Sequence, residues 1–195
     1  KRLAYLGPAG TFTEEAALAH DAHSELIPFP SILAVASAVA TGMAEEGIVP
    51  IENSIEGSVN DTLDVLIHQS RVAIRWELVL PIEQFLLAKP GASPETIQGI
   101  YSHPQALGQC RRFLERCFPK AQHVAALSTA AAVAEMMKAP VPSAAIGPQR
   151  AAQLWGAEVL ARDIQDYTPN VTRFVVLAPT DHPPTGADKT SFCFS

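Results

Sequence analysis

The expected architecture follows from residues 72–88, VAIRWELVLPIEQFLLA. Apolar side chains alternate along the chain from Val72 to Leu80, which is typical of a β-strand. Pro81 interrupts this pattern, because proline cannot donate a hydrogen bond to a neighbouring strand, and strand character resumes from Ile82 to Ala88. A strand that stops at a proline and then resumes predicts that the chain crosses here from one lobe into a second.

Strand-like and helix-like segments alternate on both sides of this crossing, which predicts an α/β fold with largely parallel sheets. A return crossing is expected near residues 174–178, so that residues 1–80 and 176–195 form the first lobe and residues 81–175 the second. A cleft between two such lobes is a natural place for a ligand. The expected strands are 3–6, 47–51, 72–80, 82–88, 97–101, 124–126, 144–146 and 175–177, and the expected helices are 11–20, 31–39, 59–69, 104–117, 128–137 and 148–155.

Composition and charge exclude several classes of protein. The chain has 195 residues, of which 48% are hydrophobic, so a buried core is well supplied. Its formal net charge of -6, with no run of basic residues, argues against a nucleic-acid partner. No apolar stretch reaches the roughly 18 residues of a membrane span, and residues 1–7 have no signal-peptide pattern. We therefore expect a cytoplasmic protein with no membrane partner.

The cysteines predict neither a disulfide nor a metal site. Cys110 and Cys117 lie seven residues apart in one expected helix, about 10 Å along its axis, too far to bridge. Together with Leu107 and Leu114 they form an apolar stripe, which favours buried, reduced thiols over catalysis. Cys193 has no assigned role, and no Cys/His spacing suggests a metal ligand set.

The end of the chain is open to two interpretations. Residues 179–189 have the composition of a linker, and residues 189–195 then begin a strand pattern that stops. This pattern fits either a short closing edge strand or a chain cut before a further domain.

A hydroxyl and a permanent cation come together at Thr172-Arg173-Phe174, directly before the apolar run 175–177. An Arg beside an apolar strand is costly unless it meets an anion, and its planar fork matches a carboxylate. The pair predicts a site for an acidic small molecule. Because the net charge is negative, attraction has to be local, from an Arg or from the N–H groups at a helix start.

Two further polar segments follow expected strands in the first half of the chain. Residues 7–13, GPAGTFT, open a helix, where backbone N–H groups and the Thr11 hydroxyl either hold an anion or only cap the helix. Residues 50–58, PIENSIEGS, lie at the carboxyl end of a buried strand, where α/β sheets bind ligands. Asn53 and Ser54 can donate hydrogen bonds to a carboxylate, whereas Glu52 would need a cation or a proton.

A third polar segment, Ser102-His103-Pro104-Gln105, again follows a strand and opens a helix. Gln105 and Gln109 lie one turn apart on the same helix face, so both are candidate ligand contacts. For His103, a capping role is favoured over catalysis, because no carboxylate partner is indicated nearby.

These segments in this order resemble the signature segments of the prephenate dehydratase family, over nearly the whole chain. The resemblance implies two α/β lobes of the type II periplasmic-binding-protein kind with the active site in the cleft. It implies a lyase of phenylalanine biosynthesis that converts prephenate to phenylpyruvate without a cofactor, in homodimers or homotetramers. An ACT regulatory domain, usual in the family, is expected to be absent from this chain, which ends at 195, so feedback inhibition by phenylalanine cannot be assigned to these residues.

The resemblance also implies roles for individual residues. Thr172 would stabilise the departing hydroxyl, and Arg173 would hold a substrate carboxylate or instead pair with Glu52 and orient Asn53. Phe174 would pack at the substrate site. The remaining implied substrate contacts are Thr11, Asn53, Ser54, Ser102, Gln105 and Gln109.

One departure limits these implied roles. Leu127 stands where some relatives have a carboxylate, so no acid role can be carried over to that position. Two other functions stay open: arogenate dehydratase, which carries out the same elimination on the amino-acid analogue, and a non-catalytic two-lobed module that binds a small anion.

Overall fold

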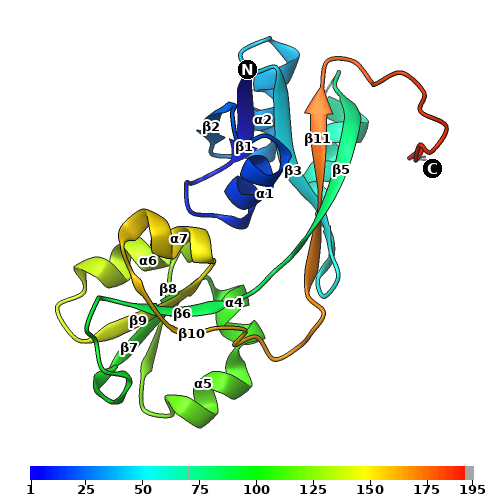
Figure 1. The fold of residues 1–195 in the computed structure, drawn as a ribbon. Helices are drawn as coiled ribbons and strands as arrows, with labels where there is room; N and C mark the ends of the chain where they lie inside the picture. The colour runs from blue at the N-terminus through cyan, green and yellow to red at the C-terminus, as the bar shows by residue number, and fades with distance from the viewer. Residues whose placement is uncertain (70, 192–195) are drawn as a thin grey trace. The chain divides into compact units, whose positions relative to one another are not determined.

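The structure, a computed structural model, describes residues 1–69 and 71–191, which divide into two compact units (Figure 1). Unit 1 contains Lys1–Leu6, Ala16–Leu80 and the chain from Thr172 onward, and unit 2 contains Gly7–Glu15 and Pro81–Val171. The chain thus leaves unit 1 after Leu80 and enters it again at Thr172, where the boundaries expected from the sequence were after residues 80 and 175. Gly7–Glu15, expected in the first lobe, groups with unit 2.

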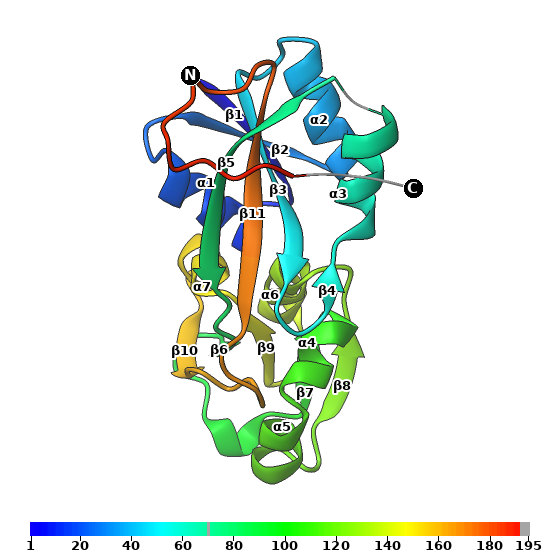
Figure 2. The ribbon, with the colours of Figure 1, turned by 90° about the vertical axis from the view of Figure 1, so that its right-hand side faces the viewer.

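Unit 1 is built on a mixed sheet with the strand order β2-β1-β3-β11-β5, with β4 paired to β3. The three long strands β3, β11 and β5 run side by side in Figure 2. The strands are β1 Arg2–Leu6, β2 Glu25–Phe29, β3 Glu46–Asn53, β4 Gly57–Ser58, β5 Ala73–Pro81 and β11 Val171–Ala178. The helices of unit 1 are α2 Ile32–Ala40 and α3 Asn60–Asp64, which continues as a π-helical turn over Val65–Gln69. Helix α1, Phe12–His20, belongs to unit 1 from Ala16 onward, and its first residues group with unit 2.

Helix α2 packs closely on the sheet of unit 1. Its N-cap Ser31 accepts a hydrogen bond from the backbone of Ala34, and its apolar residues are buried against β1, β3 and β11. A Cβ on Gly47 would lie 2.7 Å from the Val35 side chain and 2.9 Å from that of Val39. Glycine at the start of β3 therefore allows the helix to approach the strand.

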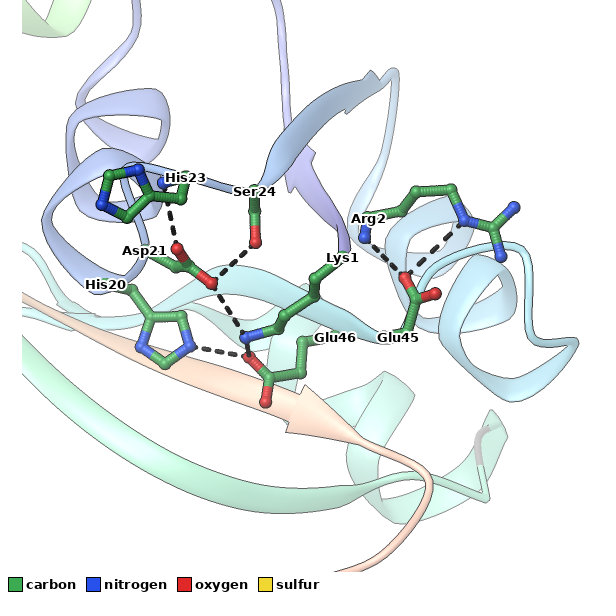
Figure 3. A network of polar contacts seen from close by, with 8 residues as sticks. All are labelled: Lys1, Arg2, His20, Asp21, His23, Ser24, Glu45 and Glu46. Carbon is green, nitrogen blue, oxygen red and sulfur yellow. Dashed lines mark hydrogen bonds and ion pairs between the residues drawn. The ribbon is translucent and has the colours of Figure 1, made fainter.

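A cluster of charged side chains joins the chain start to α1 and to the start of β3 (Figure 3). The Glu46 carboxylate lies 2.7 Å from both the Lys1 ammonium and His20 Nε2 and is almost buried. Burial raises the pKa of Glu46, but the hydrogen bonds and charges of Lys1 and His20 outweigh it, so the pKa is lowered overall. The Asp21 carboxylate also contacts Lys1, at 3.3 Å. The cluster thus links the chain start, the end of α1 and the start of β3 through ion pairs.

Unit 2 contains a second mixed sheet, in the order β10-β6-β9-β7-β8. Within the described residues, no helix combines the length and the apolar character needed to cross a membrane. The strands are β6 Phe85–Ala88, β7 Gly99–Ser102, β8 Gln122–Ala125, β9 Ser143–Gly147 and β10 Glu158–Ala161. The helices are α4 Pro104–Gln109, α5 Arg111–Cys117, α6 Thr129–Lys138 and α7 Gln149–Trp155, with a 3₁₀ turn at Pro94–Thr96.

The α/β class and the two sheets are confirmed, but the sheets are not largely parallel. Strand β1 pairs in parallel with β2 and β3, and β7 pairs in parallel with β8 and β9. Strand β3 pairs antiparallel with β11 and β4, and β6 pairs antiparallel with β9 and β10. The antiparallel pairs arise largely where the chain enters and leaves each unit. Local periodicity in the sequence does not reveal the direction in which two strands pair.

The predicted helix over residues 104–117 is wrong, because Cys110 breaks it into α4 and α5. Cys110 has the non-helical angles φ -111° and ψ 17°. Asp166 explains the break: its backbone N–H donates to the Gln109 carbonyl at 2.7 Å, and its carboxylate accepts from the Arg112 N–H at 3.0 Å. A residue more than fifty positions away thus ends one helix and caps the next.

Of the two thiols predicted to be buried, Cys110 is confirmed and Cys117 is not. Cys110 is buried, and burial, aided by the charge of Asp166, raises its pKa to about 12. Cys117 is exposed at the last residue of α5. Residues 189–191 form no strand, and the predicted strand over 189–195 otherwise lies outside the described residues, as does Cys193.

Among the described residues, the strands that the sequence did not predict are β2, β4 and β10, of which β2 and β10 lie at the ends of their sheets. Strand β2 contains Pro28, which is tolerated at a sheet edge because one side of an edge strand has no partner. Short edge strands carry weak patterns, since only part of their surface is buried.

Candidate functional site

The nine residues predicted for the site fall into two groups, one in each unit. Unit 1 holds Asn53, Ser54, Thr172, Arg173 and Phe174, and unit 2 holds Thr11, Ser102, Gln105 and Gln109.

The unit 1 group is organised by the tight turn between β3 and β4. The Asn53 side-chain oxygen Oδ1 accepts hydrogen bonds from the backbone N–H groups of Ile55 at 2.9 Å and Glu56 at 3.1 Å. Gly57, directly opposite Asn53 in the β3–β4 pair, has φ +83°, which glycine adopts without strain. The turn therefore fixes both the position of Asn53 and the orientation of its amide.

Thr172 lies opposite Asn53 in the β3–β11 pair, and the two side chains meet. The Asn53 Nδ2 donates a hydrogen bond to Thr172 Oγ1 at 2.9 Å, although the residues are 119 positions apart. The Thr172 residue is only 8% exposed. It lies inside β11 rather than before the strand as predicted, because pairing with β3 extends the strand beyond its apolar run.

Arg173 pairs with two carboxylates on the neighbouring strands. Its Nη1 lies 2.5 Å from Glu52 of β3, and its Nη2 lies 2.6 Å from Glu77 of β5. Lys189 approaches the other oxygen of Glu77 at 2.6 Å. Hydrogen bonds from Lys189 and Arg173 lower the pKa of Glu77, and hydrogen bonds to Glu77 and Glu52 raise the pKa of Arg173. The result is a row of charges across β3, β11 and β5.

This row lies on the opposite face of the sheet from the Asn53–Thr172 pair. Thr172 is opposite Asn53 and Arg173 is opposite Glu52, and the register shift comes only after Arg173. Because successive strand residues point to opposite faces, Arg173 does not share a face with the Thr172 hydroxyl. Of the two roles predicted for Arg173, the structure shows the pairing with Glu52.

The other two predicted residues of unit 1 differ in exposure. Phe174 is 1% exposed and belongs to the buried side of β11, so it packs inside the unit and is not accessible to a ligand. Ser54 is exposed in the β3–β4 turn, where a ligand can reach it.

In unit 2, Ser102 does not have the accessibility that a substrate contact needs. It is 0% exposed, and its hydroxyl donates to the Ile146 carbonyl of β9 at 2.8 Å. Ser102 is the last residue of β7, and its side chain faces the interior of the unit. Its place after an apolar run in the sequence does not reveal this orientation. Leu127, by contrast, is exposed directly before Ser128, the N-cap of α6.

His103 caps helix α4, as predicted. Its Nδ1 accepts a hydrogen bond from the backbone N–H of Gln105 at 3.3 Å, and Pro104 takes the first helical position. The Gln105 side chain is exposed. The Gln109 Oε1 accepts from Nε2 of Gln84, a buried residue, at 3.3 Å. The sequence did not predict Gln84 as a site residue, because it lies in a largely apolar segment, 25 residues before Gln109.

Thr11 has the capping geometry at the start of α1. Its hydroxyl donates to the Pro8 carbonyl at 3.0 Å and accepts from the Glu14 N–H at 3.4 Å. Glu14 is buried and pairs with Arg150 Nη2 at 3.1 Å. The backbone N–H of Arg150 donates to Glu15 at 3.0 Å, and burial raises the pKa of that carboxyl. No local sequence signal could predict this pairing over more than 130 residues.

Within residues 1–69 and 71–191, no cluster of three or more His, Cys, Asp or Glu side chains could hold a metal ion. The polar groups that this part of the chain gathers are hydroxyl, amide, guanidinium and carboxylate. Such groups bind and orient a polar organic molecule by hydrogen bonds and charge.

Comparisons with known proteins agree over the whole chain. A bifunctional chorismate mutase/prephenate dehydratase of Stutzerimonas stutzeri is 43% identical over 195 residues, which is 100% of this chain and 53% of that protein. A prephenate dehydratase of Lactococcus lactis subsp. cremoris is 40% identical over 98% of this chain and 65% of its own length. The chain thus spans between half and two thirds of these relatives.

A solved structure gives the same result. The prephenate dehydratase of Arthrobacter aurescens, solved in complex with L-Phe, matches with a TM-score of 0.87 and 34% identity. The match covers 97% of this chain and 63% of that one. The family model described as prephenate dehydratase matches residues 3–182, and the chain therefore belongs to the prephenate dehydratase family.

Proposed function

We propose that this chain converts prephenate to phenylpyruvate in phenylalanine biosynthesis. The observation that carries the proposal is the Thr172 hydroxyl, held in a buried strand pair by the Asn53 amide in a chain of this family. The reaction needs a group that stabilises a departing hydroxyl, and this is the kind of group that the pair supplies.

The proposed elimination is redox-neutral. The bond between the ring carbon and its carboxylate breaks, carbon dioxide leaves, and the bonding electrons pass through the ring to the carbon that carries the hydroxyl. The carbon–oxygen bond then breaks, the oxygen takes up a proton as water, and the ring becomes aromatic. Electrons and atoms balance without an oxidant or an electron carrier, so the proposal names no cofactor.

Thr172 acts in this proposal as a hydrogen-bond donor to the leaving oxygen. An alcohol is a poor general acid near neutral pH, since it holds its proton far too tightly to release it. A hydrogen bond that strengthens as charge develops on the oxygen lowers the barrier without proton transfer from the threonine. The proton that completes the water molecule comes from another source.

Arg173 has a positioning role in the proposal. Its pairs with Glu52 and Glu77 link β3, β11 and β5 at the level where Asn53 faces Thr172. Both ends of its fork are engaged by carboxylates, so it is less suited to hold a substrate carboxylate than the sequence suggested. Ser54, Thr11, Gln105 and Gln109 stay predicted substrate contacts.

A direct assay tests the function. The purified chain is incubated with prephenate, and phenylpyruvate is followed by its absorbance, with the Thr172→Val variant as comparator. We expect turnover by the parent chain and nearly none by the variant. Formation of no phenylpyruvate at any chain concentration would leave a binding module as the better interpretation. A parallel assay with arogenate separates the two dehydratase activities, and we expect prephenate to be preferred.

We also propose that the protein is a cytoplasmic homodimer or homotetramer, as the family resemblance implies. Light scattering after size-exclusion chromatography measures the mass in solution against the monomer mass of 20.8 kDa. A monomer at all concentrations would contradict this part of the proposal.

A further inference from the structure

The amide of Asn53 has one orientation that satisfies its surroundings. Its Oδ1 faces the N–H groups of Ile55 and Glu56, at 2.9 and 3.1 Å, and an N–H group can only donate. An amide turned the other way would set its NH₂ group against two donors. The two backbone groups therefore resolve the usual ambiguity between the oxygen and nitrogen of an Asn side chain.

The direction of the bond to Thr172 follows from this orientation. Asn53 Nδ2 carries hydrogens and no available lone pair, so in the 2.9 Å contact it is the donor and Thr172 Oγ1 the acceptor. The hydroxyl hydrogen is not used in this bond. Within residues 1–69 and 71–191, the Asn53 amide is the hydrogen-bond partner found for the Thr172 side chain.

We infer that Asn53 is a positioning residue, whose amide turns the Thr172 hydroxyl so that its hydrogen is presented to the leaving hydroxyl of the substrate. The inference rests on the proposed function and deepens it. A hydrogen bond accepted by Oγ1 also polarises the O–H group and makes it a stronger donor. The pair thereby offsets the weakness of a lone threonine as a catalytic group, in a position only 8% exposed to water.

Asn53→Asp is the variant that reverses the direction of this bond. One carboxylate oxygen keeps the two backbone N–H bonds, so the turn is preserved, while the other oxygen accepts the Thr172 hydrogen. We expect kcat to fall about 100-fold, in the range found when one donor to a developing oxyanion is removed. KM stays within about 3-fold, because the lost interaction forms mainly in the transition state. The melting temperature stays within about 2 °C.

Asn60→Asp is the matched control, since it makes the same amide-to-carboxylate change at an exposed residue at the start of α3. It keeps the parent kcat and KM. The ratio of variant kcat to parent kcat gives a second readout. For Asn53→Asp, this ratio rises as the pH is lowered from about 8 to about 5, because a protonated carboxyl can again donate to Oγ1. For Asn60→Asp it stays flat.

A third measurement does not depend on activity. In the Thr172→Val background the new carboxylate has no hydroxyl to bind, so Asn53→Asp lowers the melting temperature by about 4 °C more than in the parent. The inference is overturned if the Asn53→Asp variant keeps the parent kcat and its kcat ratio does not change with pH. It is also overturned if Asn53→Asp lowers the melting temperature equally in the parent and in the Thr172→Val background. A parent chain without turnover overturns the proposed function instead, and the melting shifts then still decide whether Asn53 and Thr172 are coupled.

Discussion

The β3–β11 region of unit 1 and the β7–α4 region of unit 2 carry the same kind of sequence signal, a polar run directly after a buried strand. In unit 1 the run enters a hairpin turn, and Asn53 meets Thr172 across the sheet. In unit 2 the run enters a helix, which uses His103 as its cap, while Ser102 faces the interior. The element that follows the strand thus decides whether the polar groups are left for chemistry or used to satisfy the backbone.

Thr172→Val gives the largest expected effect and tests the unit 1 side of the comparison. Valine has nearly the same shape but cannot donate, so we expect kcat for phenylpyruvate formation to fall about 1000-fold, or about 4 kcal/mol in the barrier, with KM nearly unchanged. Thr172→Ser, which keeps the hydroxyl, is the control and retains most of the turnover. A Val variant with parent turnover would remove Thr172 from the mechanism.

Ser102→Ala tests the unit 2 side. Loss of its hydroxyl leaves the buried Ile146 carbonyl without this donor, so we expect the free energy of unfolding to fall by about 2 kcal/mol in a urea titration. The kcat and KM for prephenate stay unchanged. Ser37→Ala, at an exposed helix position, changes stability by less than about 0.5 kcal/mol. A raised KM without loss of stability would show that Ser102 contacts the substrate after all.

Arg173→Gln tests whether the row of charges stabilises unit 1. We expect a loss of about 1 kcal/mol near neutral pH, since exposed pairs are worth little each. The pKa of Glu77 is lowered in the folded chain, so its contribution is present above its ordinary value of 4.5 and is lost as the pH falls below it. The difference between parent and variant should therefore shrink towards pH 3.

Arg111→Gln is the matched control for Arg173→Gln, because it breaks an exposed pair with Glu115 on α5. It should cost about 0.3 kcal/mol. A KM for prephenate raised about 100-fold in Arg173→Gln would restore Arg173 as a holder of substrate carboxylate.

Gln105→Ala gives the smallest expected change. The side chain is exposed and makes no packing contribution, so stability stays within about 0.5 kcal/mol of the parent. As a predicted substrate contact it should raise KM about 5-fold, the size of one hydrogen bond. An unchanged KM would leave the β7–α4 region with a purely structural function.

Much of the fold could be predicted from the sequence, because most elements have strong local patterns. The cap residue Ser31, for example, marked the start of α2. The prediction of one helix over 104–117 was wrong because the Asp166 carboxylate binds the backbone in the middle of that segment. Strand β2 was not predicted because an edge strand needs little apolar pattern. Long-range partners override local propensity in both cases.

The site was predicted as a set of residue types but not as a set of contacts. Thr172 and Asn53 were named separately, and their bond depends on the register of β3 against β11. Ser102 and Phe174 were expected at the substrate, and both are buried, because strand alternation places each of them on an inward face.

The sequence by itself determined the family, the α/β class and the chemical groups available for the reaction, because these follow from residue order and local periodicity. Only the tertiary structure decided which groups meet. The pairing of β3 with β11 brings the Asn53 amide to the Thr172 hydroxyl and places Arg173 on the other face. In unit 2, the neighbouring strand β9 supplies the carbonyl that the buried Ser102 hydroxyl binds. The physical reason is that hydrogen-bond direction and burial depend on register and face, and neither is contained in any local stretch of chain.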